Sequence, residues 1–85
     1  MRARLSARGY RCAVYVYPPG TGFPDHTHEV DKIDGVLSGS FRIVMEGNEF
    51  LLEADDLLAV PRGRAHSAEV VGDVPVISID AVRSG

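Results

Sequence analysis

The feature that most constrains the fold of this chain is a succession of short strand-like segments, separated by turn residues about every eight to twelve positions. Segment 11–17 is typical, because its β-branched and aromatic residues alternate between two faces. Further strands are expected around 26–28 and at 31–37, 40–46, 50–53, 57–60, 65–71 and 75–82. This spacing is typical of sandwiches and barrels, so the sequence predicts an all-β fold.

One segment, residues 50–60, also has the composition of a short amphipathic helix. Its flanks favour two strands and a turn instead. Gly47 and Asn48 precede it and tolerate the positive φ angles of a tight hairpin, while Pro61 closes it. Asp55 and Asp56 suit a turn in its middle, so we predict an antiparallel return.

The chain has 85 residues, which is near the small end of what folds alone. No linker, repeat or low-complexity tract divides it, so we expect one domain over residues 1–85, with 1–9 as a flexible or edge-strand N-terminus. A bound metal or a partner subunit would add stability, because each acts on the folded state only.

Charge and composition exclude several classes of protein. Four of the nine cationic residues fall in the first eleven positions, and all twelve acidic residues follow them. No aromatic reader motif accompanies this basic arm, so we expect no nucleic-acid partner. No stretch is apolar enough to span a membrane, and no secretory signal is evident. The one cysteine, Cys12, agrees with a reducing compartment, and we expect a cytoplasmic protein.

The three histidines of the sequence fall in two motifs. Residues two apart in a strand point the same way, so His26 and His28 are expected to present two imidazoles to one face. The third, His66, ends a Pro-x-Gly-x-x-His turn about forty residues later. Three neutral imidazoles on fixed strands leave coordination positions open, as catalytic metal sites require. The sequence therefore predicts a three-histidine metal site.

These motifs resemble the two motifs of the cupin superfamily. Its members are small antiparallel β-barrels of the jelly-roll type. Gly20, five residues and His26-Thr-His28 match the first motif, and Gly39 falls at its closing glycine. Residues 61–66 match the spacing of the second motif, although Asp55 and Val70 stand where a glycine and an asparagine are expected. The resemblance implies a cupin-like barrel, a homodimer, and a divalent metal such as iron, manganese, nickel or zinc.

The main departure from the family pattern is its glutamate ligand, whose position falls here on Lys32 or Ile33. An ammonium about 4 Å from a dication would be repelled by several kcal/mol even at an effective dielectric near 20. Lys32 could lose its proton, turn away, or pair with Asp34 on the same strand face. Alternatively, a bulge could bring in Asp31 as the fourth ligand, or the barrel could be a metal-free ligand pocket.

Two functions follow as expectations. The first is a small metal-dependent enzyme, with dioxygenase, isomerase or lyase-like chemistry on a small polar metabolite, in which Lys32 and Asp34 are the candidate acid–base residues. The second is a non-catalytic module that binds or senses a small ligand or metal. Tyr15 and Tyr17 are candidates for the mouth of the barrel, and Arg62 and Arg64 for steering an anionic substrate.

Overall fold

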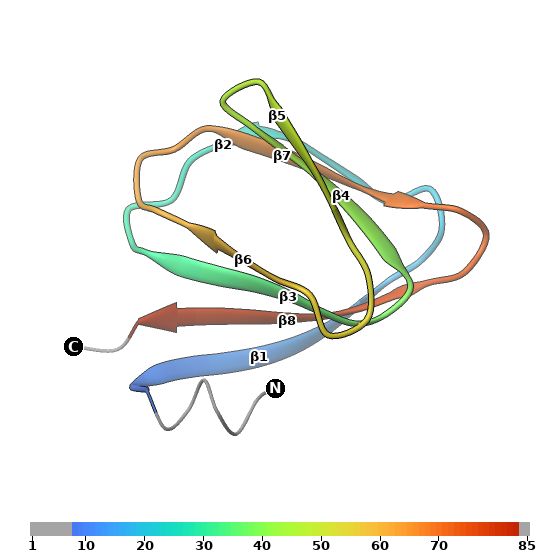
Figure 1. Cartoon of the computed structure of the whole chain (residues 1–85), viewed down its shortest axis with the longest axis horizontal. Coiled ribbons are helices and arrows are strands. Elements are labelled where there is room, and N and C mark those ends of the chain that lie inside the picture. The colour runs from blue at the N-terminus through green and yellow to red at the C-terminus, as the bar shows by residue number, and fades with distance from the viewer. Residues whose placement is uncertain (1–7, 84–85) are drawn as a thin grey trace.

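The computed structural model describes residues 8–83, which form two four-stranded antiparallel sheets facing each other (Figure 1). The first sheet has the order β1-β8-β3-β6 and the second the order β2-β7-β4-β5. The strands are β1 (Tyr10–Tyr17), β2 (Gly22–His26), β3 (Lys32–Ser38), β4 (Ser40–Met45), β5 (Asn48–Leu52), β6 (Leu57–Val60), β7 (His66–Val71) and β8 (Val76–Arg83). The predicted all-β jelly-roll fold is confirmed.

The core fills the space between the two sheets. Its fully buried members include Val36, Ile43 and Val76, each 0% exposed. Beside them, the ring of Tyr17 lies 5.0 Å from that of Phe23 and 5.6 Å from that of Phe41, measured between centroids. These aromatic rings join strands of both sheets, and they form one wall of the cavity described below.

Residues 50–60 form two strands and a turn, as predicted, and not a helix. Asp55 occupies the turn with a φ of 72°, and its N–H donates to the carbonyl of Val36 at 2.8 Å. The preceding hairpin differs slightly from expectation, because the positive φ angles fall on Glu46 (51°) and Gly47 (80°) and not on Asn48. The turn therefore lies one residue earlier than the sequence indicated.

A glycine fixes the tight passage from β3 to β4. Gly39 has a φ of 88°, and a Cβ atom added there would lie 2.5 Å from the carbonyl oxygen of Pro75. Both the backbone conformation and the close approach require a residue without a side chain. This contact joins the end of β3 to the segment leading into β8.

The prediction for residues 1–9 lies largely outside the described residues, and a single domain over the whole chain stays a prediction. In the part of the chain that the structure describes, no helix is long and apolar enough to cross a membrane.

Candidate metal centre

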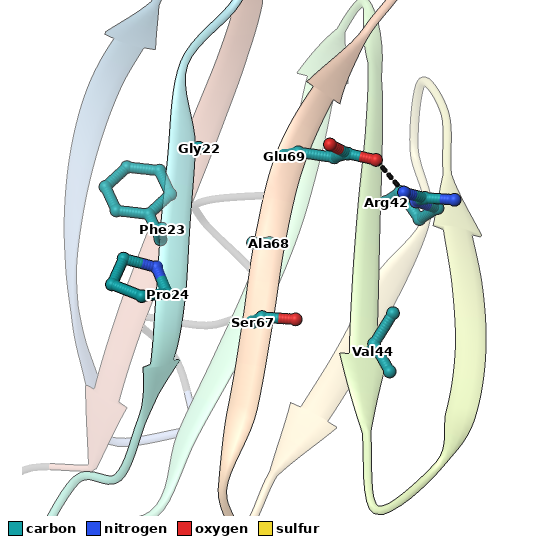
Figure 2. Close-up of a pocket in the computed structure, with 8 residues that line it drawn as sticks. All are labelled: Gly22, Phe23, Pro24, Arg42, Val44, Ser67, Ala68 and Glu69. Carbon is teal, nitrogen blue, oxygen red and sulfur yellow. Dashed lines mark hydrogen bonds and ion pairs between the residues drawn. The ribbon is translucent and has the colours of Figure 1, made fainter.

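The outward side of the second sheet carries a hollow of about 300 Å³, lined by residues of β2, β4 and β7 (Figure 2). Its one cation, Arg42, pairs with Glu69 and, at 2.8 Å, with Glu49. The guanidinium is thus neutralised by its own neighbours. None of the predicted site residues lines this hollow, so it is not the candidate site.

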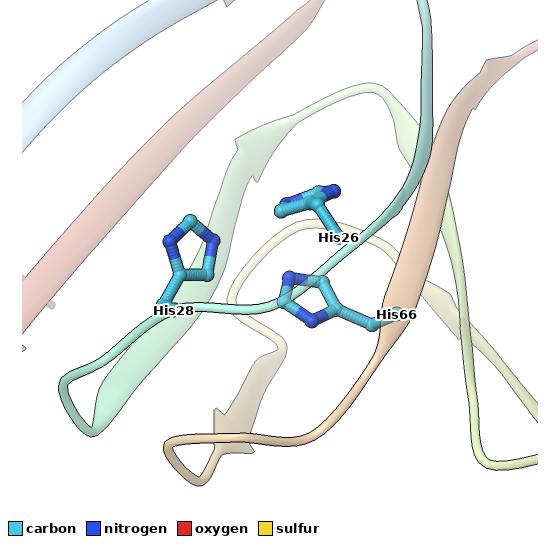
Figure 3. Close-up of side chains that lie close together, drawn as sticks. All are labelled: His26, His28 and His66. Atoms are coloured by element: carbon cyan, nitrogen blue, oxygen red, sulfur yellow. The ribbon is translucent and has the colours of Figure 1, made fainter.

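The three histidines gather between the sheets (Figure 3). Their ring centroids are 4.3 Å apart for His26 and His66, 4.8 Å for His26 and His28, and 5.2 Å for His28 and His66. One ligand nitrogen from each ring lies within 4.8 Å of the others. Among the described residues, this is the group of His, Cys, Asp and Glu side chains that could hold a metal ion.

The three histidines lie in different local structures, which are the end of β2, the start of β7 and the loop after β2. His26 ends β2 and His66 begins β7, and the two residues are direct partners across the strands. His28 lies beyond the end of β2, so it does not share a strand with His26 as the sequence suggested. Its position is fixed instead by the Pro-x-Gly turn, where the N–H of Gly63 donates to the carbonyl of His28 at 2.9 Å. Both motifs are therefore tied together by backbone bonds.

Hydrogen bonds set the tautomers of two of the rings. Nδ1 of His26 lies 2.7 Å from the carbonyl oxygen of Pro24, and Nδ1 of His66 lies 3.0 Å from that of Arg64. A carbonyl oxygen only accepts, so each Nδ1 carries the hydrogen and each Nε2 keeps its lone pair. A backbone carbonyl behind the ring is the usual support of a metal-ligating histidine.

The third ring, that of His28, has a nitrogen without a hydrogen-bond partner beside the other two histidines. Nε2 of His28 is buried and has no hydrogen-bond partner. Burial lowers the pKa of His28, helped by the charge of Lys32, and burial likewise lowers the pKa of His66 against the effect of its bond to Arg64. Both rings are therefore neutral near neutral pH, which is the form that binds a metal. The donor set fits a divalent transition metal.

Lys32 points into the cavity beside the histidines and forms two ion pairs there. Its Nζ lies 3.1 Å from Oδ1 of Asp34 and 2.9 Å from Oδ1 of Asp80. The two aspartates are direct partners in the ladder between β3 and β8. The predicted pairing of Lys32 with Asp34 is therefore present, and Asp80 adds a second carboxylate. We call Lys32, Asp34 and Asp80 the charged cluster.

The pKa values show how the charged cluster shares its protons. Burial, together with a hydrogen bond to Asp80, raises the pKa of Asp34 to about 7. Burial works to raise the pKa of Asp80 too, but hydrogen bonds from Asp34 and Lys32 outweigh it and lower the pKa. Burial works to lower the pKa of Lys32, but the two carboxylates raise it overall. Below about pH 7 the cluster therefore holds a protonated lysine and one proton between two carboxyl groups.

The histidines and the charged cluster line one cavity of about 200 Å³. Tyr17, Phe23 and Phe41 form its aromatic wall, and Ala68 and Ser78 complete the lining. The Ser78 hydroxyl donates to the carbonyl of Gly35 at 3.3 Å. A cavity with an apolar wall and a few convergent polar groups is what a small-molecule site needs.

The other predicted residues lie around this cavity. The carboxylate of Asp31 accepts the backbone N–H of Arg62 at 2.9 Å, and Asp31 is not part of the three-histidine group. Arg64 pairs with Glu46 across two loops, both side chains being about half exposed. Tyr15 is 46% exposed and stacks on Tyr17 at 6.1 Å between centroids.

Asp80 is the site residue that the sequence reading missed. The available signal was its place in strand 75–82, where Ser78 and Asp80 alternate with Ile77, Ile79 and Ala81. An acidic residue in the middle of an otherwise apolar strand is uncommon without a partner. The identity of that partner depended on the register with β3, which only the structure supplies.

Comparison with known proteins places residues 13–82 within the family model described as the cupin domain. The chain is 38% identical over 58 residues to the tetracenomycin polyketide synthase protein TcmJ from Streptomyces glaucescens. That match covers 67% of this chain and 39% of TcmJ, so the chain spans well under half the length of this relative.

Solved structures share the fold. The crystal structure of the cupin protein BF4112 from Bacteroides fragilis matches with a TM-score of 0.74 and 28% identity, over 91% of this chain and 68% of that one. The DMSP lyase DddQ from Ruegeria pomeroyi matches with a TM-score of 0.79 and 26% identity, over 89% of this chain and 39% of DddQ.

Proposed function

Because the chain belongs to the cupin family, we propose that it is a metal-dependent enzyme acting on a small polar metabolite, with a divalent ion held by His26, His28 and His66. The observation that carries this proposal is the state of the ring nitrogens. Two rings have their Nε2 freed by carbonyls behind them, and the third has a buried nitrogen without a partner. Buried polar atoms normally have partners, so the unpartnered Nε2 of His28, beside two Nε2 atoms that keep their lone pairs, favours a ligand.

A divalent ion bound there would supply Lewis acidity to polarise a carbonyl or to activate water. Imidazole ligands suit iron, manganese, nickel and zinc alike, so the ligand set does not choose among them. Asp31 is occupied by a backbone N–H, which favours a three-histidine site whose remaining positions take water or substrate.

The chain's own residues would bind and orient the substrate and move its protons. The aromatic wall of Tyr17, Phe23 and Phe41 shields one side of the cavity, and its volume of about 200 Å³ admits only a small molecule. Lys32 and Asp34, the acid–base candidates of the sequence, hold exchangeable protons inside that volume, and we propose that the acid–base group of the cavity is built around them.

The relatives support enzyme chemistry without naming the substrate. DddQ is a lyase and TcmJ is a polyketide synthase protein, and the chain spans 39% of each. Their reactions are their own, since one fold carries many activities. A lyase-like or isomerase-like proton transfer agrees best with a cavity that holds a lysine and two carboxyl groups.

The alternative function is a non-catalytic module that binds or senses a small ligand, without metal. The observation that favours it is the ammonium of Lys32 in the same cavity as the histidines, because a cation there opposes binding of a dication.

Elemental analysis of the purified protein tests the choice, with His66→Ala prepared in parallel and Ser67→Ala as the neighbouring control. We expect about one equivalent of a transition metal in the native protein and in Ser67→Ala, and its loss in His66→Ala. Native protein that stays metal-free after incubation with iron, manganese, nickel and zinc salts would move the binding module to first place.

We also propose that the chain is a cytoplasmic homodimer. The dimer is supported by the outward side of the first sheet, where Val14 lies opposite Ile79 and Val16 opposite Ile77. Val14, Val16 and Leu57 on this side are 43%, 63% and 47% exposed. The outward side of the second sheet instead carries Arg42 and its two glutamates. The side is apolar except for Arg83 at the end of β8, and an apolar sheet face is complementary to its own copy.

A further inference from the structure

We propose that Asp34 and Asp80 form a proton-sharing pair that serves as the acid–base group of the cavity, with Lys32 as its positioning residue, and that the substrate is a small carbonyl acid. This inference rests on the proposed function, and it adds Asp80, the substrate class and the type of reaction. It stands on the geometry of the charged cluster, which lies in the same cavity as the histidines but outside the group that could hold the metal.

The first step is the register of the sheet. Asp34 and Asp80 lie directly opposite each other on β3 and β8, and their side chains face the same cavity. Two ionised carboxylates in that arrangement repel each other, and burial together with a hydrogen bond to Asp80 raises the pKa of Asp34 to about 7, so the pair keeps one proton below that pH. The pair titrates as a unit, and neither aspartate owns the proton alone.

The second step concerns which member the substrate meets. The Asp80 side chain is 28% exposed, whereas those of Asp34 and Lys32 are 10% and 9% exposed. Asp80 is therefore the more accessible member of the pair, and Asp34 is the more buried proton store. Near neutral pH a proton held with a pKa of about 7 is well matched to transfer in either direction.

The third step assigns Lys32. Its ammonium lies within 3.1 Å of both carboxyl groups, so it stabilises the pair after the shared proton has left and both are ionised. Lys32 is thus a positioning residue, which holds the pair in place and keeps its doubly ionised form accessible. Its own amine is bound to both carboxylates, which leaves it poorly placed to touch a substrate.

The chemistry that this pair can perform without any other reagent is the interconversion of an enolate and a carbonyl compound. In one direction the shared proton leaves the pair and forms a C–H bond with the electron pair of the enolate C=C bond, while the lone pair on oxygen closes the C=O bond. In the other direction the proton returns from carbon to the pair, and the C–H electrons return toward oxygen. Charge and atoms balance, and no oxidant is needed.

The cavity sets the substrate class. Its volume of about 200 Å³ and its mixed aromatic and charged lining fit a small 2-oxo or 3-oxo acid. The oxo and carboxylate oxygens of such an acid suit the histidine side, because oxygen donors can take the open positions of a metal site. Its α-carbon then has room to meet Asp80 across the cavity.

Infrared spectroscopy of the metal-free 85-residue chain tests the shared proton. At about pH 6 the native protein should show the C=O stretch of one buried protonated carboxyl. The band should disappear in Asp34→Asn and also in Asp80→Asn, where Lys32 is left with a single carboxylate that ionises. Absence of the band in the native protein, or its survival in Asp80→Asn, would overturn the pair. Lys32→Met should keep the band to higher pH than the native protein, a shift that a purely structural role would not produce.

Hydrogen–deuterium exchange tests the chemistry. Pyruvate in D₂O is incubated with the zinc-loaded chain, and the loss of its methyl proton signal is followed by NMR against zinc alone. We expect exchange above that background, unchanged in Asp73→Asn, an exposed control, and reduced at least 100-fold in Asp80→Asn with equal zinc content. No exchange by the zinc-loaded native chain, or native exchange in Asp80→Asn, would overturn the acid–base role. A failure to take up zinc would instead count against the proposed metal site, and the infrared result would still stand or fall by itself.

Discussion

Replacing Asp34 with asparagine should change how the stability of this protein depends on pH. Asp34 is 7% exposed, and burial with the Asp80 hydrogen bond raises its pKa from 3.8 to about 7. In the unfolded chain the carboxyl releases its proton above its ordinary pKa, whereas in the folded chain it keeps the proton until about pH 7. Folding is therefore unpenalised below about pH 4, and the penalty grows until the pH passes 7.

The size of the penalty follows from the shift. About three pKa units, at about 1.4 kcal/mol each, give roughly 4 kcal/mol as an upper value. The lowered pKa of Asp80 acts in the opposite direction, so we expect a net change of about 2–4 kcal/mol. Asparagine does not titrate, and its amide can still donate to Asp80 as the protonated carboxyl does. The variant should match the native protein near pH 4 and become more stable than it as the pH rises to 8.

Urea unfolding of the metal-free proteins, followed by far-ultraviolet circular dichroism at several pH values, measures this difference. Circular dichroism is the suitable probe because the chain has no tryptophan. His28 and His66 also titrate in this range, but they do so in both proteins, so the difference between the two curves isolates the aspartate. A difference that stays constant within about 0.5 kcal/mol from pH 4 to 8 would refute the reasoning.

Three further substitutions test the fold and the assembly. Gly39→Ala should cost at least about 2 kcal/mol more than Gly47→Ala in thermal unfolding, since both have positive φ but only Gly39 faces the Pro75 carbonyl. Ile43→Ala, at a fully buried position, should cost about 2–5 kcal/mol in urea unfolding. Val16→Glu should weaken the proposed dimer at least 10-fold in sedimentation experiments. Leu51→Glu is the control on the second sheet, with 52% exposure against 63% for Val16, and it should leave the dimer intact. A native protein of 9.2 kDa at every concentration would contradict the dimer.

Much of the fold could be predicted from local signals. The strand at 57–60 has the predicted bounds, and most of the others differ from expectation by one or two residues. The exception is β2, which spans Gly22–His26 where a strand was expected around 26–28. These strands are visible in the sequence because alternation and turn residues are properties of neighbouring positions. The hairpin shifted by one residue because Glu46, and not Asn48, adopts positive φ. That choice depends on the register between β4 and β5, which local propensity does not fix.

The candidate site was predictable to the extent that its residues sit in motifs. The three histidines meet as expected, although His28 is held by a backbone bond from Gly63 and not by a strand shared with His26. Asp80 could not be found in this way, because its contact with Asp34 and Lys32 arises from pairing of β3 with β8, strands far apart in the chain. A motif describes residues at fixed separations along the chain, whereas this contact depends on which strands pair and in which register.

The lysine at the place of the family's glutamate shows why the charge of one residue is a poor guide to the charge of a site. Considered alone, an ammonium next to a dication predicts a repulsion of several kcal/mol. In the structure Lys32 is paired with Asp80, and Asp34 keeps its proton below about pH 7, so the charged cluster has no net charge in that range. A metal held by the histidines would face an ion pair, whose field falls off faster with distance than that of a lone cation. Loss of the shared proton would leave the cluster with a net negative charge, which attracts a dication. Lys32 is therefore compatible with a metal in this cavity, because its partners come from β3 and β8 together.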